Sequence, residues 1–158
     1  MIRRIVSGGQ TGVDRAALDA ALSLGLPCGG WCPRGRKAED GPIDSRYPLV
    51  ETASEDYAER TRENVRDSDG TLVLTRGRPS GGTALTISLA RKAGRPLLVL
   101  DLRRDPDPVE VPRWARAHDV SVLNVAGPRE SQRPGIQGEA RRFLEKALAG
   151  IVPPGPIG

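Results

Sequence analysis

The stretch SGGQTGVDRAALDAA, residues 7–21, connects an apolar pair to an alanine-rich helical pattern. The apolar pair is Ile5-Val6, and the connecting turn carries glycine at positions 8, 9 and 12. A glycine inside a regular element costs about 1 kcal/mol relative to alanine, so these three glycines need a reason. Either the turn is tight, or something approaches its backbone. The stretch predicts a β-strand that passes through a glycine turn directly into an α-helix.

Short apolar runs alternate with helical patterns along the rest of the chain. Strands are predicted at residues 3–7, 27–31, 70–75, 95–102 and 120–127, and helices at 14–24, 54–67, 83–93, around Trp114 and at 137–148. Strands that are apolar throughout are typical of a parallel sheet with helices on both faces. We therefore predict an α/β fold: a single Rossmann-like domain over residues 1–150, with an open, mostly parallel sheet of about five to six strands. Residues 151–158 are predicted to form a flexible C-terminal tail.

The composition is that of a globular domain with a mildly basic charge. The 158 residues carry a formal net charge of +4, and 3% of them are aromatic. This charge favours an anionic ligand but is too small to require a nucleic-acid partner. No apolar run is long enough to span a membrane, and the start MIRRIVSGG lacks the apolar region of a signal peptide. We expect a cytoplasmic protein that has no membrane partner and forms a homo-oligomer.

Cys28 and Cys32 are the two cysteines of the chain. In an extended LPCGGWCP segment they would lie roughly 13 Å apart, beyond the reach of a disulfide. Their spacing does not fit a zinc knuckle, and His118 is the single histidine. We predict buried or half-buried free thiols and no metal site, with a metal or redox role as the alternative.

Three turns that follow predicted strands are rich in glycine and small polar residues. Two of them open directly into helices, where free N–H groups and the helix dipole favour an anion. In the third, Arg129 could hold a phosphate with its forked guanidinium. Because ligands of doubly wound sheets bind at the carboxyl ends of strands, we predict an anionic small-molecule site, with tight βα connections as the alternative. The residues assigned to it are Gly8, Gly9, Gln10, Thr11, Gly12, Asp14, Arg34, Gly81, Gly82, Thr83, Gly127, Arg129, Glu130 and Ser131.

Several of the assigned and neighbouring side chains have two interpretations. Asp14 either caps the first helix or contacts a ribose hydroxyl or a cation. The charged loop at residues 34–40 is either solvated surface or a lid over the ligand. Trp31 either packs structurally or stacks on a base or pterin ring. One face of the helix at 54–67 is polar and predicts a buried network, a subunit contact or a ligand contact; it carries Tyr57, Arg60, Thr61 and Asn64.

A series of sequence blocks resembles the putative molybdenum carrier family. The blocks are GGQTGVDRAALDAA, GGWCPRGRKAEDGPI with YPLVET, YAERTRENVRDSDGTLVL, GGTALT and NVAGPRES followed by PGI, and they run in order over most of the chain. That family is grouped with DNA-processing protein A and the LONELY GUY phosphoribohydrolases in one Rossmann-like superfamily. The resemblance implies a nucleotide-like ligand at the strand ends. It makes the molybdenum cofactor a candidate, because that pterin carries a phosphate.

The second glycine turn departs from the LONELY GUY signature Pro-Gly-Gly-x-Gly-Thr-x-x-Glu. The segment PSGGTALT, residues 79–86, has no glutamate at the matching place, so phosphoribohydrolase activity by the same route is not expected. The function predicted is binding of a phosphorylated, nucleotide-like small molecule. The alternatives are a nucleotide-processing hydrolase that uses Asp14, Asp40 or Glu130, and, less favoured because aromatic residues are few, a single-stranded DNA-binding protein. The strand at 70–75 is expected beside the first strand, so that the first two glycine turns form one composite site.

Overall fold

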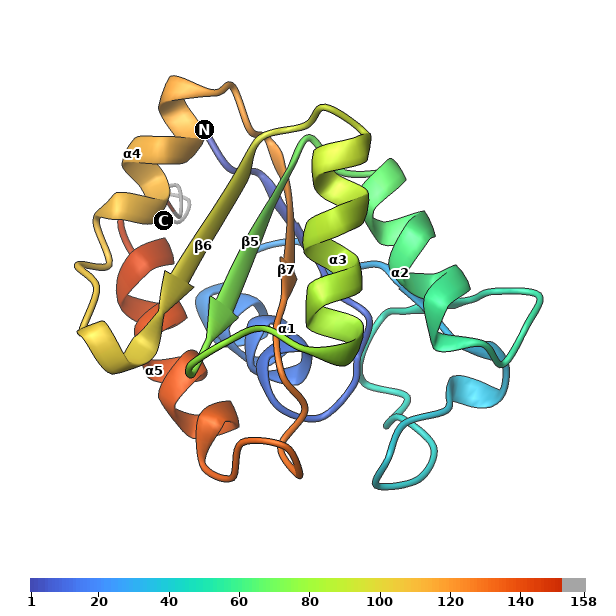
Figure 1. Ribbon diagram of the computed structural model, residues 1–158. Coiled ribbons are helices and arrows are strands. Elements are labelled where there is room, and N and C mark those ends of the chain that lie inside the picture. Colours follow the sequence, from blue (N-terminus) through green and yellow to red (C-terminus); the bar gives the residue numbers. More distant parts are fainter. Residues whose placement is uncertain (152–158) are drawn as a thin grey trace, which may run out of the picture.

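The computed structural model describes residues 1–151, which form the predicted α/β fold around one open sheet (Figure 1). The strand order of this five-stranded sheet is β2-β1-β7-β5-β6. Every neighbouring pair in it is parallel. The bounds are Arg4–Val6 for β1, Cys28–Gly29 for β2, Gly70–Thr75 for β5, Leu97–Asp101 for β6 and Val122–Ala126 for β7.

Helices cover both faces of the sheet. On one face α1 (Val13–Leu24) packs against α5 (Ile136–Leu148), and α4 (Glu110–Ala117) lies against α5. On the other face α2 (Tyr57–Arg66) packs against α3 (Gly81–Lys92), and Figure 1 shows this pair on the near side of the strands. Two short 3-10 turns, Arg34–Arg36 and Leu102–Arg104, complete the helical segments. Within residues 1–151, no helix is long and apolar enough to cross a membrane.

Aliphatic residues and alanine build the core, as the low aromatic content requires. All residues of β5 are buried, and α1 turns an alanine-rich face inward that includes Ala16, Ala17 and Leu18. Gly25 ends α1 in the left-handed conformation, which glycine adopts without strain. The core extends to Ile151, which is 7% exposed; the rest of the predicted tail, 152–158, lies outside the described residues.

Two predicted elements differ from the structure by more than a shift of one or two residues at an end. The strand predicted at 27–31 is divided at Gly30, whose φ of +126° is incompatible with a continuous strand. Its first part is β2, and its second part, β3 (Trp31–Cys32), pairs with β4 (Val50–Glu51) in a separate two-stranded sheet. The second helix begins after Asp56, which accepts a hydrogen bond from the backbone N–H of Ala58, and not at Ser54.

The prediction that the first strand and the strand at 70–75 are neighbours in the sheet is wrong. β7 lies between β1 and β5 and pairs with both: Leu123 is in register with Ile5, and Val125 with Leu72. The last strand of the chain is thus the central strand of the sheet. The chain leaves this centre in opposite directions, from β1 outward to β2 and from β5 outward to β6.

Candidate functional site

A cleft opens at the carboxyl ends of the central strands, between α2 and α3. This is the point at which the connections of the sheet diverge, where doubly wound folds bind their ligands. Its volume is about 90 Å³. Residues from β1 to the turn after β7 line it: Gly8, Gln10, Asp14, Tyr57, Ala58, Arg60, Thr61, Asn64, Gly82, Thr83, Leu85, Thr86, Asn124, Val125, Ala126, Gly127, Arg129 and Gln132.

Half of the residues assigned from the sequence line this cleft. They are Gly8, Gln10, Asp14, Gly82, Thr83, Gly127 and Arg129. The other assigned residues, Gly9, Thr11, Gly12, Arg34, Gly81, Glu130 and Ser131, are not among the lining residues. Arg34 lies in the 3-10 turn and donates to the carbonyl oxygen of Ala53.

The amino end of α3 supplies a free cradle of backbone N–H groups. Thr83 and Ala84 donate their N–H groups to the carbonyl oxygen of Ser80, whereas within residues 1–151 no acceptor contacts those of Gly81 and Gly82. Gly82 has an ordinary backbone conformation, and a Cβ added to it would meet nothing within 4 Å. The space beside Gly82 is therefore available to a ligand that accepts hydrogen bonds.

The glycines of the first turn are required by packing within the protein. A Cβ on Gly8 would collide with the Arg60 side chain, and one on Gly12 would collide with the backbone of Pro128 and Arg129. The space beside Gly9 is filled by the side chains of Ile43 and Leu49. Both reasons given above for this turn apply. The turn is tight, since Gly9 and Gly12 have φ values of +78° and +82°, and the close approach to its backbone is made by protein atoms.

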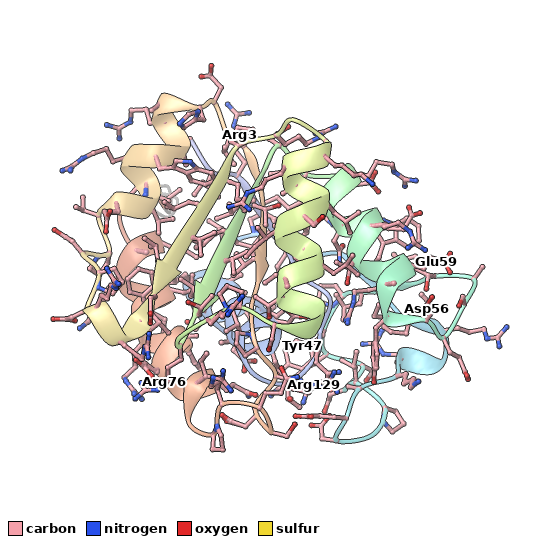
Figure 2. All side chains as sticks on the ribbon, in the orientation of Figure 1. Arg3, Tyr47, Asp56, Glu59, Arg76 and Arg129 are labelled. Carbon is pink, nitrogen blue, oxygen red and sulfur yellow. The ribbon has the colours of Figure 1, made fainter. Side chains whose placement is uncertain are left out.

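Tyr57 is the aromatic side chain of the cleft, and three cations surround its ring. Lys37 Nζ lies 4.8 Å from the ring centre, and the guanidinium carbons of Arg60 and Arg129 lie at 5.2 and 5.8 Å. Figure 2 shows Arg129 near the amino end of α3. Within residues 1–151, no carboxylate forms an ion pair with Lys37 or Arg129. The mouth of the cleft therefore carries an excess of positive charge.

Asp14 is a buried carboxyl group that lines the same cleft. It is 8% exposed, and its Oδ2 lies 3.8 Å from Arg60 Nη1, which donates instead to the carbonyl oxygen of Gly8. Burial raises the pKa of Asp14 to about 6, although the nearby Arg60 charge, the Gln10 backbone and Arg15 oppose this effect. The helix cap is Gly12, so Asp14 is not the capping residue that one interpretation made it.

The polar face of α2 forms a buried network, as one of its three interpretations predicted. Asn64 is 3% exposed, donates from Nδ2 to the carbonyl oxygen of Trp31 and accepts at Oδ1 from the N–H of Trp31. The indole of Trp31 donates to Asp67, outside the cleft lining. Trp31 therefore has the structural role, and Tyr57 is the aromatic side chain available to a ligand.

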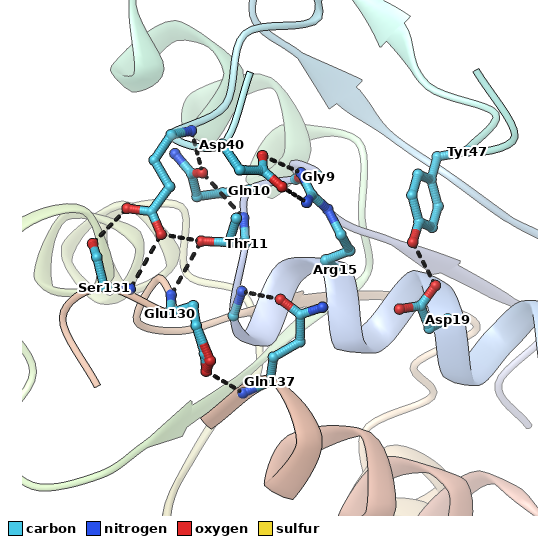
Figure 3. Close-up of polar contacts among 12 residues, drawn as sticks. Gly9, Gln10, Thr11, Arg15, Asp19, Asp40, Tyr47, Glu130, Ser131 and Gln137 are labelled. Carbon is cyan, nitrogen blue, oxygen red and sulfur yellow. Dashed lines mark hydrogen bonds and ion pairs between the residues drawn. The ribbon is translucent and has the colours of Figure 1, made fainter. Parts of the chain in front are cut away.

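The charged loop at residues 34–49 lies against the first and third turns (Figure 3). Arg36 organises it by donating to four backbone carbonyl groups, those of Ile43, Asp44, Tyr47 and Leu49. Glu39 accepts hydrogen bonds from Thr11 Oγ1 and from the N–H and hydroxyl of Ser131. Asp40 forms an ion pair with Arg15. The loop is thus an ordered wall beside the cleft.

No metal centre was found in the described part of the chain. Among residues 1–151, no group of three or more His, Cys, Asp or Glu side chains is placed to hold an ion. Cys28 and Cys32 are free and buried, and burial raises the pKa of both thiols, which keeps them protonated at neutral pH. The prediction of buried free thiols is confirmed.

Sequence reasoning missed several residues of the cleft. Asn124 lies within a run that the sequence predicts as a buried strand, and so it was not assigned to the site. In the structure it is in β7 and donates to Thr71 Oγ1. Leu85 and Thr86 of α3, and Gln132 after β7, also line the cleft. The sequence alone does not show which face of a helix or turn is directed toward the cleft. A polar residue inside an otherwise apolar strand, as at Asn124, was the available signal.

The chain is similar to known proteins over most of its length. Residues 5–148 match a sequence model described as the circularly permutated YpsA SLOG family. Among solved structures, the crystal structure of a putative molybdenum carrier protein from Syntrophus aciditrophicus SB is similar, with 44% sequence identity and a TM-score of 0.89. The match covers 94% of this chain and 96% of that one. A search of curated proteins found no match.

Proposed function

Since the chain belongs to the circularly permutated YpsA SLOG family, we propose that its cleft binds a phosphorylated, nucleotide-like small molecule. The observation that carries this proposal is the backbone cradle at Gly81-Gly82, which has no acceptor within residues 1–151, next to Lys37 and Arg129, which have no ion-pair partner there. Backbone N–H groups at a helix start and a forked guanidinium together favour a phosphate group.

The small volume of the cleft indicates that only part of the ligand lies inside it. Sites for drug-sized ligands typically have volumes of about 300–1,000 Å³, whereas the volume of this cleft is about 90 Å³. This small volume suits a phosphate better than a whole nucleoside or pterin. The rest of the ligand then lies in the open mouth, against the ring of Tyr57.

The molybdenum cofactor is one candidate for this ligand, since the similar crystal structure is named a putative molybdenum carrier protein. No described cluster of side chains offers metal ligation, so the cofactor would be held as cargo through its phosphate and its pterin ring. A nucleotide satisfies the same contacts. Mass spectrometry of the small molecule released from denatured, freshly purified protein distinguishes the two, together with its molybdenum content.

A nucleotide-processing hydrolase is the second candidate, favoured by the position of Asp14. Of the three acids suggested by the sequence, Asp40 is paired with Arg15, and Glu130 accepts from the N–H groups of Gly135 and Gln137. Asp14 lines the cleft, and its pKa of about 6 suits a general acid or base near neutral pH.

The substitution Gly82→Val tests the proposed phosphate position. Its side chain would enter the open space at the helix start without straining the backbone. Losing one hydrogen bond to a charged oxygen costs about 1.5–3 kcal/mol, so binding of the copurifying ligand should weaken at least tenfold.

A matched control is Gly150→Val, which also adds a side chain in open space but lies after α5. Both variants should keep the melting temperature of the unliganded parent. If folded Gly82→Val binds the ligand as tightly as the parent does, the phosphate does not lie at this helix start.

A further inference from the structure

We propose that the Glu39 carboxylate fills a second anion subsite at the rim of the cleft, and that a ligand carrying two separated phosphoryl groups displaces it. The proposal rests on the proposed function, because it adds a second contact to the same anionic ligand. It differs in place: the first phosphate lies at Gly82, and the second subsite lies at Ser131 and Thr11.

The contacts of Glu39 are those by which proteins hold an anion. Its Oε1 accepts from the backbone N–H of Ser131 at 3.1 Å and from the hydroxyl of Thr11, and its Oε2 accepts from the hydroxyl of Ser131. Thr11 is fixed for this contact, because its Oγ1 accepts the N–H of Glu130 at 3.1 Å. Three donors from two different segments thus converge on one carboxylate group. Figure 3 labels the two residues that supply them, Thr11 and Ser131.

Glu39 is ionised in this position. Desolvation alone would raise its pKa, but the hydrogen bonds from Ser131 and Thr11 and the charge of Arg129 together hold the pKa below its ordinary value. The residue is nevertheless exposed to solvent. Ser131, which supplies two of the three donors, is exposed as well, whereas Thr11 is buried. A carboxylate in contact with water, on donors of which two are open to solvent, is a replaceable occupant.

The rim subsite and the cleft are adjacent. Gln10 lines the cleft, and its Oε1 accepts the backbone N–H of Glu39 at 2.9 Å. Arg129 also lines the cleft, and its charge acts on Glu39. One ligand can therefore extend from Gly82 past Arg129 to the rim.

The charge around the mouth supports a ligand with more than one anionic group. Lys37 belongs to the same loop as Glu39, and Arg129 to the same turn as Ser131. In the described chain neither cation has an ion-pair partner, and both lie over the ring of Tyr57. Glu39 is tethered to the loop and neutralises part of this charge while no second phosphoryl group is bound.

Titration of the protein with inorganic phosphate tests both subsites, with backbone amide resonances as the readout. The amide of Gly82 reports on the cleft, and the amide of Ser131 reports on the rim. In the parent, phosphate should shift Gly82 saturably and leave Ser131 unchanged. In Glu39→Ala, both amides should shift, and the number of bound phosphates should rise from one to two per chain.

Two further variants control this experiment. Glu51→Ala removes another carboxylate that holds the loop, one that accepts from the N–H of Gly35, and should leave the Ser131 amide insensitive to phosphate. If Glu39→Ala does not fold, Glu39→Gln keeps the size of the side chain without its charge. In Glu39→Gln, the Ser131 amide should respond at a phosphate concentration at least about tenfold lower than in the parent. A tenfold change corresponds to the loss of one hydrogen bond to a charged oxygen.

The outcomes separate the two proposals. A Ser131 amide that stays insensitive to phosphate in folded Glu39→Ala and Glu39→Gln would show that Glu39 only fixes the loop, which overturns the rim subsite. A Gly82 amide that does not respond in any variant overturns the phosphate position in the cleft instead. A response of Ser131 in Glu39→Ala supports the rim subsite in either case.

Discussion

Replacing Asp14 by asparagine should change how the stability of the protein depends on pH. The pKa of Asp14 rises from 3.8 to about 6 on folding, so between these values the folded state holds a proton that the unfolded state has lost. Stability contributed by this group therefore falls as the pH rises through that interval. A shift of about two pKa units, at 1.36 kcal/mol each, corresponds to about 3 kcal/mol. Asp14→Asn lacks this term.

The assay is thermal unfolding of the parent and of Asp14→Asn at a series of pH values from acidic to neutral. The difference in melting temperature should move in favour of the variant by roughly 6–12 °C, because 1 kcal/mol is worth about 2–4 °C in a domain of this size. Because the other titrating groups are the same in both proteins, their contributions cancel in the difference in melting temperature between the parent and Asp14→Asn.

Asp40→Asn serves as the control of opposite sign. Hydrogen bonds and the charge of Arg15 lower the pKa of this exposed carboxyl group, so its removal should destabilise the protein at neutral pH and lose that effect on acidification. If the parent and Asp14→Asn melt in parallel across the whole series, Asp14 is not a strained buried carboxylate, and its candidacy as an acid or base at neutral pH fails.

Three other predictions concern the ligand and the assembly. Arg129→Ala should weaken ligand binding less than Gly82→Val does and reduce its salt dependence, as measured by titrations at several salt concentrations, since it removes a charge without closing the cleft; an unchanged salt slope would contradict this. Incubation with nucleoside monophosphates should release no free base, because Thr86 stands where the phosphoribohydrolase signature has glutamate; base and ribose phosphate detected by chromatography would favour the hydrolase. Light scattering should give a mass above the 16.9 kDa of one chain, and a monomer at micromolar concentration would refute the predicted homo-oligomer.

Local patterns predicted most of the elements, because helix and strand periodicity is local information. The buried run at Gly70–Thr75 and the glycine end of the first helix are examples. The order of the strands is not local: nothing within the segment at 120–127 indicates that it enters between two earlier strands. The same reason explains why the first two glycine turns were expected side by side.

The residues of the candidate site could be predicted where their position follows from the strand directly before them. Gly82 and Arg129 line the cleft as expected because each follows a strand end. Tyr57 was recognised as part of a polar helix face, but spacing alone did not show that this face looks into the cleft. Trp31 was the more obvious aromatic, and its indole is instead held by Asp67, which is distant in the sequence.

The central position of β7 has a consequence for how the protein is made. If the strands are numbered from β7 onward, through β1, β2, β5 and β6, the order β2-β1-β7-β5-β6 becomes 3-2-1-4-5, the order of doubly wound nucleotide-binding sheets. In this chain, however, that central strand leaves the ribosome last. Until then β1 and β5 each have an unpaired edge, and the pairs β2-β1 and β5-β6 share no hydrogen bonds. Completing a sheet by pairing strands that are far apart in the sequence is slow. Asn124, Val125, Ala126, Gly127 and Arg129 also line the cleft. We therefore expect the nascent chain to complete its sheet and its cleft in the same late step.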